Sequence, residues 1–209
     1  MGQSGDGVTA HDHERRKALE ADWRERLAAN QPSESRGDWP LPPGTPLQPA
    51  AVLLPLVRRS EGYAVVFTQR AAHLNVHAGQ ISFPGGRQDP TDADLWTTAL
   101  RETHEEIGVP PETIEPLGCL EAIISITRFH VTPFAGFLPP DFPYRINPAE
   151  VATLFEVPLD HLMDPGIHHI EMRQIPGGGT YPVHHFAFDG HDIWGMTGHI
   201  LHRFLQTIC

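Results

Sequence analysis

The sequence predicts an α/β domain, and three observations carry that prediction. Two apolar runs of strand length, 50–57 and 63–68, flank a charged turn and indicate a β-hairpin. The stretch 95–107 places apolar residues at helical spacing, which suits a helix packed on a sheet. A second amphipathic stretch, 193–205, follows several further strand-like runs. Strands interleaved with helices over 209 residues fit one domain with a well-buried core.

The chain before this domain predicts a helix and a linker. Residues 1–9 are small and polar, and the text from His11 to Asn30 predicts a charged helix. Leu19, Trp23 and Leu27 form its narrow apolar stripe. We favour a peripheral helix laid on the domain over a dimer or lid element. The proline-rich run 39–46 predicts an extended linker, so the chain divides into residues 1–49 and a domain over 50–209.

The second half of the domain predicts strands before the final helix. The strand-like runs are 114–125, 129–137 and 151–158, and 160–163 predicts a short helix. Residues 168–174 and 180–188 predict a hairpin around the glycines that follow Pro176. We expect Asp192 to cap the C-terminal helix.

Composition excludes several classes of function. A formal net charge of −11 argues against nucleic-acid or anionic-membrane binding, and no apolar run is long enough to span a bilayer. Two cysteines give no disulfide framework. The fourteen histidines show no zinc-ligand spacing, so His168-His169 and His184-His185 are expected to be strand or surface residues. We expect a cytoplasmic enzyme, with a homodimer left open.

The predicted helix 95–107 also carries three glutamates that share one face. Glu102, Glu105 and Glu106 stand at i, i+3 and i+4, where like charges repel and give a helix no structural advantage. A hard divalent cation would reverse that interaction. The alternative is a solvated acidic face. The neighbours favour the metal, because Arg101 can hold Glu102 by a charge-assisted hydrogen bond and Gly85-Gly86 lets the backbone approach a ligand closely.

These residues resemble the Nudix box, Gly-x5-Glu-x7-Arg-Glu-x-x-Glu-Glu-x-Gly, with Gly108 as its final glycine. Two departures stand out: Asp92 replaces the first glutamate, and eight rather than seven residues separate it from Arg101. The run 67–86 just upstream is similar to the extra signature of the coenzyme A pyrophosphatase branch. The opening of the last helix, Ile193 to Thr197, resembles the same branch.

The resemblance implies a fold, a cofactor and roles for single residues. It implies a Nudix-type α/β/α sandwich with a mixed sheet, and Mg²⁺ or Mn²⁺ as cofactor. The implied metal ligands are Glu102, Glu105 and Glu106. The implied catalytic residues are Glu102, Arg101 and Glu150, with Glu156 behind Glu150. The implied substrate-binding residues are Arg70, Gly85 and Gly86, and the Gly85 carbonyl is expected to face the metal. Among Arg58, Arg70, Arg87 and Arg128, only Arg70 lies inside the upstream signature.

The implied substrate is coenzyme A or an acyl-coenzyme A, cleaved at its diphosphate. Two alternatives stay open at this point. One is a Nudix hydrolase of ADP-ribose or another nucleoside diphosphate, because the box alone serves either substrate. The other is a Nudix-fold binding module without hydrolysis, which a broken glutamate set or an appended DNA-binding motif would favour; the sequence shows neither.

Overall fold

The structure is a computed structural model that describes residues 10–29, 44–74, 77–174 and 179–209. Most of the predicted linker 39–46 and of the turn before Gly179 lies outside these residues. None of the helices in the described part of the chain is both long and apolar enough to cross a membrane.

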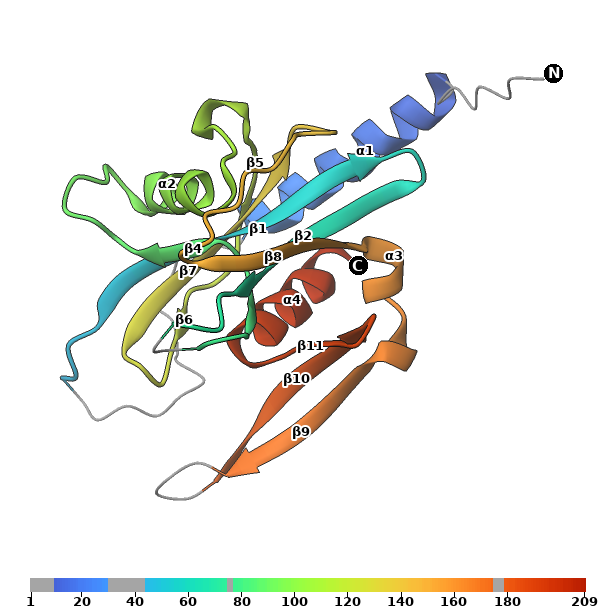
Figure 1. Cartoon of the computed structure of the whole chain (residues 1–209). Coiled ribbons are helices and arrows are strands. Elements are labelled where there is room, and N and C mark those ends of the chain that lie inside the picture. The colour runs from blue at the N-terminus through green and yellow to red at the C-terminus, as the bar shows by residue number, and fades with distance from the viewer. Residues whose placement is uncertain (1–9, 30–43, 75–76, 175–178) are drawn as a thin grey trace.

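A mixed eight-stranded sheet organises the chain (Figure 1). Its long central strand β1 (Gln48–Arg59) pairs with three others: antiparallel with β2 (Gly62–Arg70) and β4 (Gly85–Arg87), and parallel with β7 (Phe129–Leu138). The remaining strands are β3 (Ile81–Ser82), β5 (Glu115–Cys119), β6 (Ile123–Ile124) and β8 (Val151–Pro158). The predicted hairpin over 50–68 is confirmed. The run 114–125 forms two short strands rather than one.

Helices cover both faces of this sheet. The pleat sends alternate residues of β1 to opposite sides. Leu53 and Val57 join Ala99 and Ile107 of α2 (Leu95–Ile107), whereas Leu54 and Leu56 join a larger cluster that contains α4 (Gly195–Ile208). In Figure 1, α2 and α4 lie on opposite sides of the sheet, as the predicted sandwich requires. A 3₁₀ turn, η1 (Pro111–Thr113), follows α2.

A second, three-stranded antiparallel sheet lies beyond α4. Its order is β11 (His191–Ile193), β10 (Thr180–Phe188) and β9 (His168–Gln174), so the predicted second hairpin is confirmed. α3 (Leu159–Leu162) and the 3₁₀ turn η2 (Pro165–Ile167) lead into it from β8. Figure 1 shows α4 between the two sheets, and its buried face, including Leu201 and Phe204, belongs to the main core.

The N-terminal helix α1 (Ala10–Ala28) packs against β5 and α4, which confirms a peripheral helix laid on the domain. Trp23 and Leu27 are buried, but Leu19 is 42% exposed, so the predicted stripe is shorter than expected. Polar contacts supplement the packing: Arg58 donates to both carboxylate oxygens of Glu20, at 2.7 and 2.8 Å.

One predicted helix cap is wrong. Asp192 lies in β11, and its carboxylate accepts from His185 Nδ1 at 2.9 Å instead of capping α4. The capping residue of α4 is Trp194, whose side chain makes no capping hydrogen bond. The hydrogen-bonding register of β11 with β10 extends to Ile193, and this pairing holds Asp192 in a strand.

Candidate active site

Helix α2 is fixed at both ends by local chemistry. Asp94 caps its start, accepting a hydrogen bond from the Thr97 backbone N–H at 2.7 Å. Gly108 ends it in the left-handed conformation, with φ of 77°, which a residue without a side chain adopts at low cost. Between these ends, Ala99, Thr103 and Ile107 are buried against the sheet. The glutamate face is therefore held toward the Gly85-Gly86 strand.

The two glycines of β4 permit that approach. A Cβ on Gly86 would lie 2.4 Å from Oε1 of Glu102. A Cβ on Gly85 would lie 2.4 Å from the Ala51 carbonyl oxygen on β1. Gly85 thus fits β4 onto β1, and Gly86 makes room for the Glu102 carboxylate. The structure therefore shows close approach at both glycines within the protein itself, and the expected approach to a ligand stays a prediction.

Arg101 donates hydrogen bonds to three carboxylates of the site. Its Nη1 donates to Glu102 Oε1 at 2.9 Å and to Glu105 Oε2 at 3.1 Å. The expected Arg101–Glu102 contact is thus present. Asp92 is the partner that sequence reasoning missed, since Arg101 donates to both of its oxygens at 3.0 Å.

Asp92 is almost fully buried, with a side chain 4% exposed. It also accepts hydrogen bonds from the Thr98 hydroxyl and the Asp89 backbone N–H, both at 2.9 Å. The hydrogen bonds from Arg101 outweigh burial and lower the pKa of Asp92 to about 2, so it is ionised at neutral pH. The residue that departs from the Nudix box is the anchor of Arg101.

Glu106 is a buried carboxylate that forms no ion pair with another residue in the described part of the chain. It is 3% exposed, and the Gly85 N–H at 3.4 Å is its hydrogen-bond donor. Burial raises the pKa of Glu106 to about 8, although the Gly85 N–H opposes this, and the nearby charges of Glu102 and Glu150 raise it further. Burial likewise raises the pKa of Glu102, against the effect of Arg101.

Two backbone hydrogen bonds bring the loop before β8 to this carboxylate cluster. Asn147 N–H donates to the carbonyl of Glu106 at 2.9 Å, and Ala71 N–H donates to the carbonyl of Glu150 at 2.8 Å. Glu150 therefore lies between the end of α2 and the end of β2, and its charge acts on both Glu102 and Glu106. The structure brings this predicted residue to the site.

Arg70 reaches the same place from the end of β2. Its positive charge acts on Glu106 and lowers the pKa of that carboxyl. Its Nε is buried and has no hydrogen-bond partner among the described residues. Buried polar atoms are usually hydrogen-bonded, so this unsatisfied donor at the site requires an explanation.

Two other residues considered from the sequence, Glu156 and Arg58, bind to partners outside the carboxylate cluster. Glu156 accepts from Arg59 at 2.9 Å through one oxygen, and its second oxygen bonds the same guanidinium. Arg58 is held by Glu20 and Glu115 and lies over the Phe137 ring at 3.9 Å. Both residues have structural partners that account for their positions.

The donor set fits a hard divalent cation. Carboxylate oxygens are the ligands that Mg²⁺ and Mn²⁺ take, and three of them project from adjacent turns of α2. Glu106 gains most from a cation, because burial raises the cost of its charge. Glu105 is 49% exposed and Glu102 15% exposed, so the cluster opens to solvent on one side.

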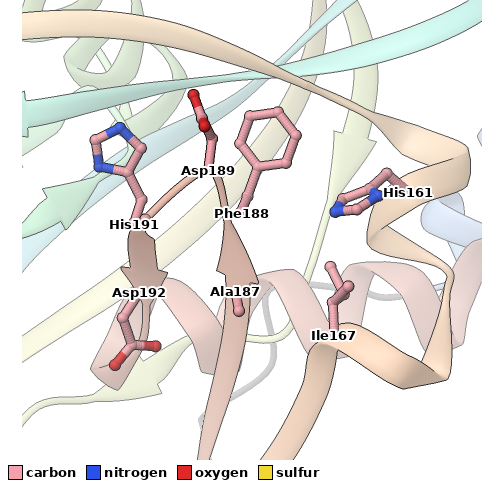
Figure 2. Close-up of a pocket in the computed structure, with 8 residues that line it drawn as sticks. His161, Ile167, Ala187, Phe188, Asp189, His191 and Asp192 are labelled. Carbon is pink, nitrogen blue, oxygen red and sulfur yellow. The ribbon is translucent and has the colours of Figure 1, made fainter.

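A pocket in the described part of the protein lies apart from this site. It has a volume of about 700 Å³ and lies between α3 and the β10–β11 hairpin. Figure 2 shows His161 facing Phe188 across it, with His191 on the neighbouring strand. Phe188 and His191 both stack on Phe155 of β8. None of the α2 glutamates lines it.

Comparison with known proteins agrees with this geometry. The NUDIX domain model matches residues 46–176. Two proteins called uncharacterized Nudix hydrolase NudL, from Salmonella paratyphi B and Salmonella newport, are each 43% identical over 159 residues, covering 76% of this chain and 82% of theirs. The chain belongs to the Nudix family and is a Nudix hydrolase by descent.

Solved structures resemble it more distantly. A Nudix hydrolase from Alicyclobacillus acidocaldarius is 22% identical, with a TM-score of 0.48 over 57% of this chain and 83% of that one. The NUDIX domain of Shewanella oneidensis NrtR, crystallised with ADP ribose, is 21% identical, with a TM-score of 0.45 over 59% and 81%.

Proposed function

We propose that this protein hydrolyses the diphosphate bond of coenzyme A or an acyl-coenzyme A with the help of Mg²⁺ or Mn²⁺. The products would be 3′,5′-ADP and 4′-phosphopantetheine or its acyl form. The observation that carries the proposal is the burial of Glu106 beside Glu102 and Glu150, three carboxylates arranged around the glycine strand. The upstream run 67–86 supports coenzyme A as the substrate.

The site residues have three proposed roles: they bind the metal ions, position Glu102 and accept a proton. Glu102, Glu105 and Glu106 would hold the ions, together with the Gly85 carbonyl. Ions held there would acidify a water molecule and neutralise charge on the phosphate oxygens. Arg101 fixes Glu102, with which it shares a 2.9 Å hydrogen bond. We assign Glu102 and Glu150 as the candidate acceptors of the proton of the attacking water, an assistance worth about 10²–10⁴-fold.

Arg70 is the residue that we propose binds the substrate phosphates. Its Nε has no hydrogen-bond partner among the described residues and its charge acts on Glu106, so we propose that a bound diphosphate or the ribose 3′-phosphate accepts a hydrogen bond from this guanidinium. The overall charge of −11 repels an anionic substrate, so such a local cation is needed.

The test is product analysis with coenzyme A, ADP-ribose and NADH, each with and without Mg²⁺ or Mn²⁺. We expect 3′,5′-ADP from coenzyme A only with metal. Glu106→Gln should abolish it, while Glu112→Gln, an exposed glutamate on η1, should not change it. Cleavage of ADP-ribose but not coenzyme A would reject the substrate. No cleavage of any substrate would reject hydrolysis.

Arg70 is tested with dephospho-coenzyme A, which lacks the 3′-phosphate. If Arg70 reads that group, Arg70→Gln lowers kcat/KM for coenzyme A and leaves dephospho-coenzyme A unchanged. An equal loss on both would show that Arg70 contacts the diphosphate instead. The base is identified by comparing pH–rate profiles of Glu102→Gln and Glu150→Gln, because only loss of the base removes the acidic limb.

A further inference from the structure

A second cluster of metal-ligating side chains lies on the far side of the main sheet from α2. It is formed by His168, His184 and His202, which come from β9, β10 and α4. One nitrogen from each ring lies within 4.8 Å of the others. His184 is 5% exposed, and the other two are half-buried.

The fold brings these three residues together from distant parts of the chain. In the β9–β10 register, His168 pairs with Phe186 and His184 pairs with Ile170, so the two histidines are diagonal neighbours on one face. α4 comes close to that face at Gly198, where a Cβ would lie 2.3 Å from the His184 carbonyl oxygen. His202 stands one helical turn after Gly198, and its ring stacks on His184 at 3.8 Å.

The distances are near those of a coordinated ion. In a tetrahedral zinc site with Zn–N bonds of about 2.0–2.1 Å, ligand nitrogens lie about 3.3 Å apart. His168 Nε2 and His184 Nδ1 are 2.9 Å apart, and all three ligand atoms fit within 4.8 Å. The His202 ring stacks face to face on His184, with an angle of 16° between the ring planes, so it must rotate out of this stack for the three lone pairs to converge on one ion. In the His168–His184 hydrogen bond, one of the two facing nitrogens carries a proton. When a metal binds, that proton would move to the other nitrogen of the same ring, so that both facing nitrogens offer a lone pair to the metal.

The chemistry of the cluster differs from that of the glutamate site. Imidazole nitrogens suit zinc, copper and nickel, whereas Mg²⁺ takes oxygen ligands. Burial and the neighbouring histidines lower the pKa of His184 to about 4, which agrees with the neutral form that binds metals. A cavity of about 290 Å³ adjoins the cluster, lined in part by His168, His202, Asp164 and Cys209.

We propose that His168, His184 and His202 form a three-histidine site for a divalent transition metal of the zinc class. An ion held by them would tie β9 and β10 to α4, beside the cavity that His168 and His202 line. The site is separate from the α2 carboxylates and does not depend on the proposed hydrolysis.

The experiment measures Zn²⁺ binding by calorimetry on untagged, chelator-treated protein in excess Mg²⁺, which occupies the glutamates. Co²⁺ serves as the spectroscopic probe, because a tetrahedral Co²⁺ site absorbs visible light strongly. We compare wild type with His184→Gln and His202→Gln. The matched control is His169→Gln, the exposed residue next to His168, whose ring stacks on His185.

We expect one Zn²⁺ per chain, a tetrahedral Co²⁺ spectrum and a metal-dependent rise in Tm. Loss of an outer-sphere partner alone costs about 10–100-fold in metal affinity, so loss of a ligand should weaken Zn²⁺ binding by at least about 100-fold. His169→Gln should bind as wild type. Since His184→Gln can disturb packing, the half-exposed His202→Gln decides the matter. Wild-type affinity in folded His202→Gln, or an octahedral Co²⁺ spectrum, would overturn the site.

Discussion

Arg101 and Asp92 form a two-pronged ion pair: Nε and Nη2 of the arginine each donate to one oxygen of the aspartate at 3.0 Å. The same guanidinium then reaches Glu102 and Glu105 through Nη1. A buried aspartate thus sets the position of two proposed metal ligands by way of one arginine.

Asp92→Asn should weaken both stability and hydrolysis. The amide keeps the shape but cannot accept all the hydrogen bonds that the carboxylate receives, so the free energy of unfolding should fall by about 1–3 kcal/mol. Activity should fall because Arg101 is no longer fixed. Urea unfolding and coenzyme A turnover measure the two effects. Asp160→Asn, on an exposed position of α3, is the control, and an equal loss there would contradict the role of Asp92.

The stability supplied by Asp92 should be sensitive to acid. Its pKa of about 2 in the folded protein lies below the value of about 3.9 in unfolded chains. A lowered folded-state pKa means that the contribution is complete above about pH 5 and is lost as pH falls toward about 2. The difference in unfolding free energy between wild type and Asp92→Asn should therefore be constant near neutrality and shrink below about pH 4. A difference that grows in acid would contradict this.

The two glycines of β4 should fail in different ways. In Gly86→Ala the new methyl meets the flexible end of Glu102, so the fold survives while the carboxylate moves. A displacement of about 1 Å can cost about 10²-fold in rate. In Gly85→Ala the methyl meets the backbone of Ala51 and Val52, and we expect destabilisation of about 3 kcal/mol. Turnover and Tm, measured on both variants, separate the two roles; a fully active Gly86→Ala would contradict the first.

The N-terminal helix should contribute to global stability through its buried residues, and Leu27 is the one that is completely buried. Leu27 is fully buried, and a Cβ on Gly118 of β5 would lie 2.5 Å from the Leu27 Cβ. Leu27→Ala should therefore cost about 2–5 kcal/mol. Leu19→Ala, on the same helix but 42% exposed, should change stability by about 0.5 kcal/mol or less. Denaturant unfolding followed by circular dichroism measures both, and similar losses would mean that α1 does not pack as described.

The parts of the fold that follow from local pattern were predictable. The hairpins over 48–70 and 168–188, helix α2 and the glutamate face all follow from spacing and turn chemistry within short windows. The cap of α4 was not, because strand pairing of β11 overrides the capping preference of Asp192. The exposure of Leu19 depends on how far α1 extends beyond the body of the domain.

The residues of the two candidate sites also differ in how far the sequence predicts their proximity. Glu102, Glu105 and Glu106 share a helix, so their proximity can be read from spacing. The approach of Glu150 and Arg70 depends on two loop hydrogen bonds that no local pattern encodes. The three histidines are harder still, because a strand register and a helix-to-strand approach at Gly198 bring them together. The spacing of the three histidines along the chain predicts neither the strand register nor the approach of the helix.

The parallel pairing of β1 with β7 has a consequence for biosynthesis. Gln48 is in register with Phe129, so the middle of the sheet cannot close until about 80 further residues have been translated. At about 5–20 residues per second, the ribosome needs roughly 4–16 seconds for that stretch. During this interval the β1–β2 hairpin emerges with both outer edges incompletely paired, because β1 awaits β7 and β2 awaits β8. Unpaired strand edges are the kind of surface that associates with other chains. Chaperone dependence during expression should therefore peak before β7 emerges, and slowing translation between residues 60 and 129 should lower the soluble yield.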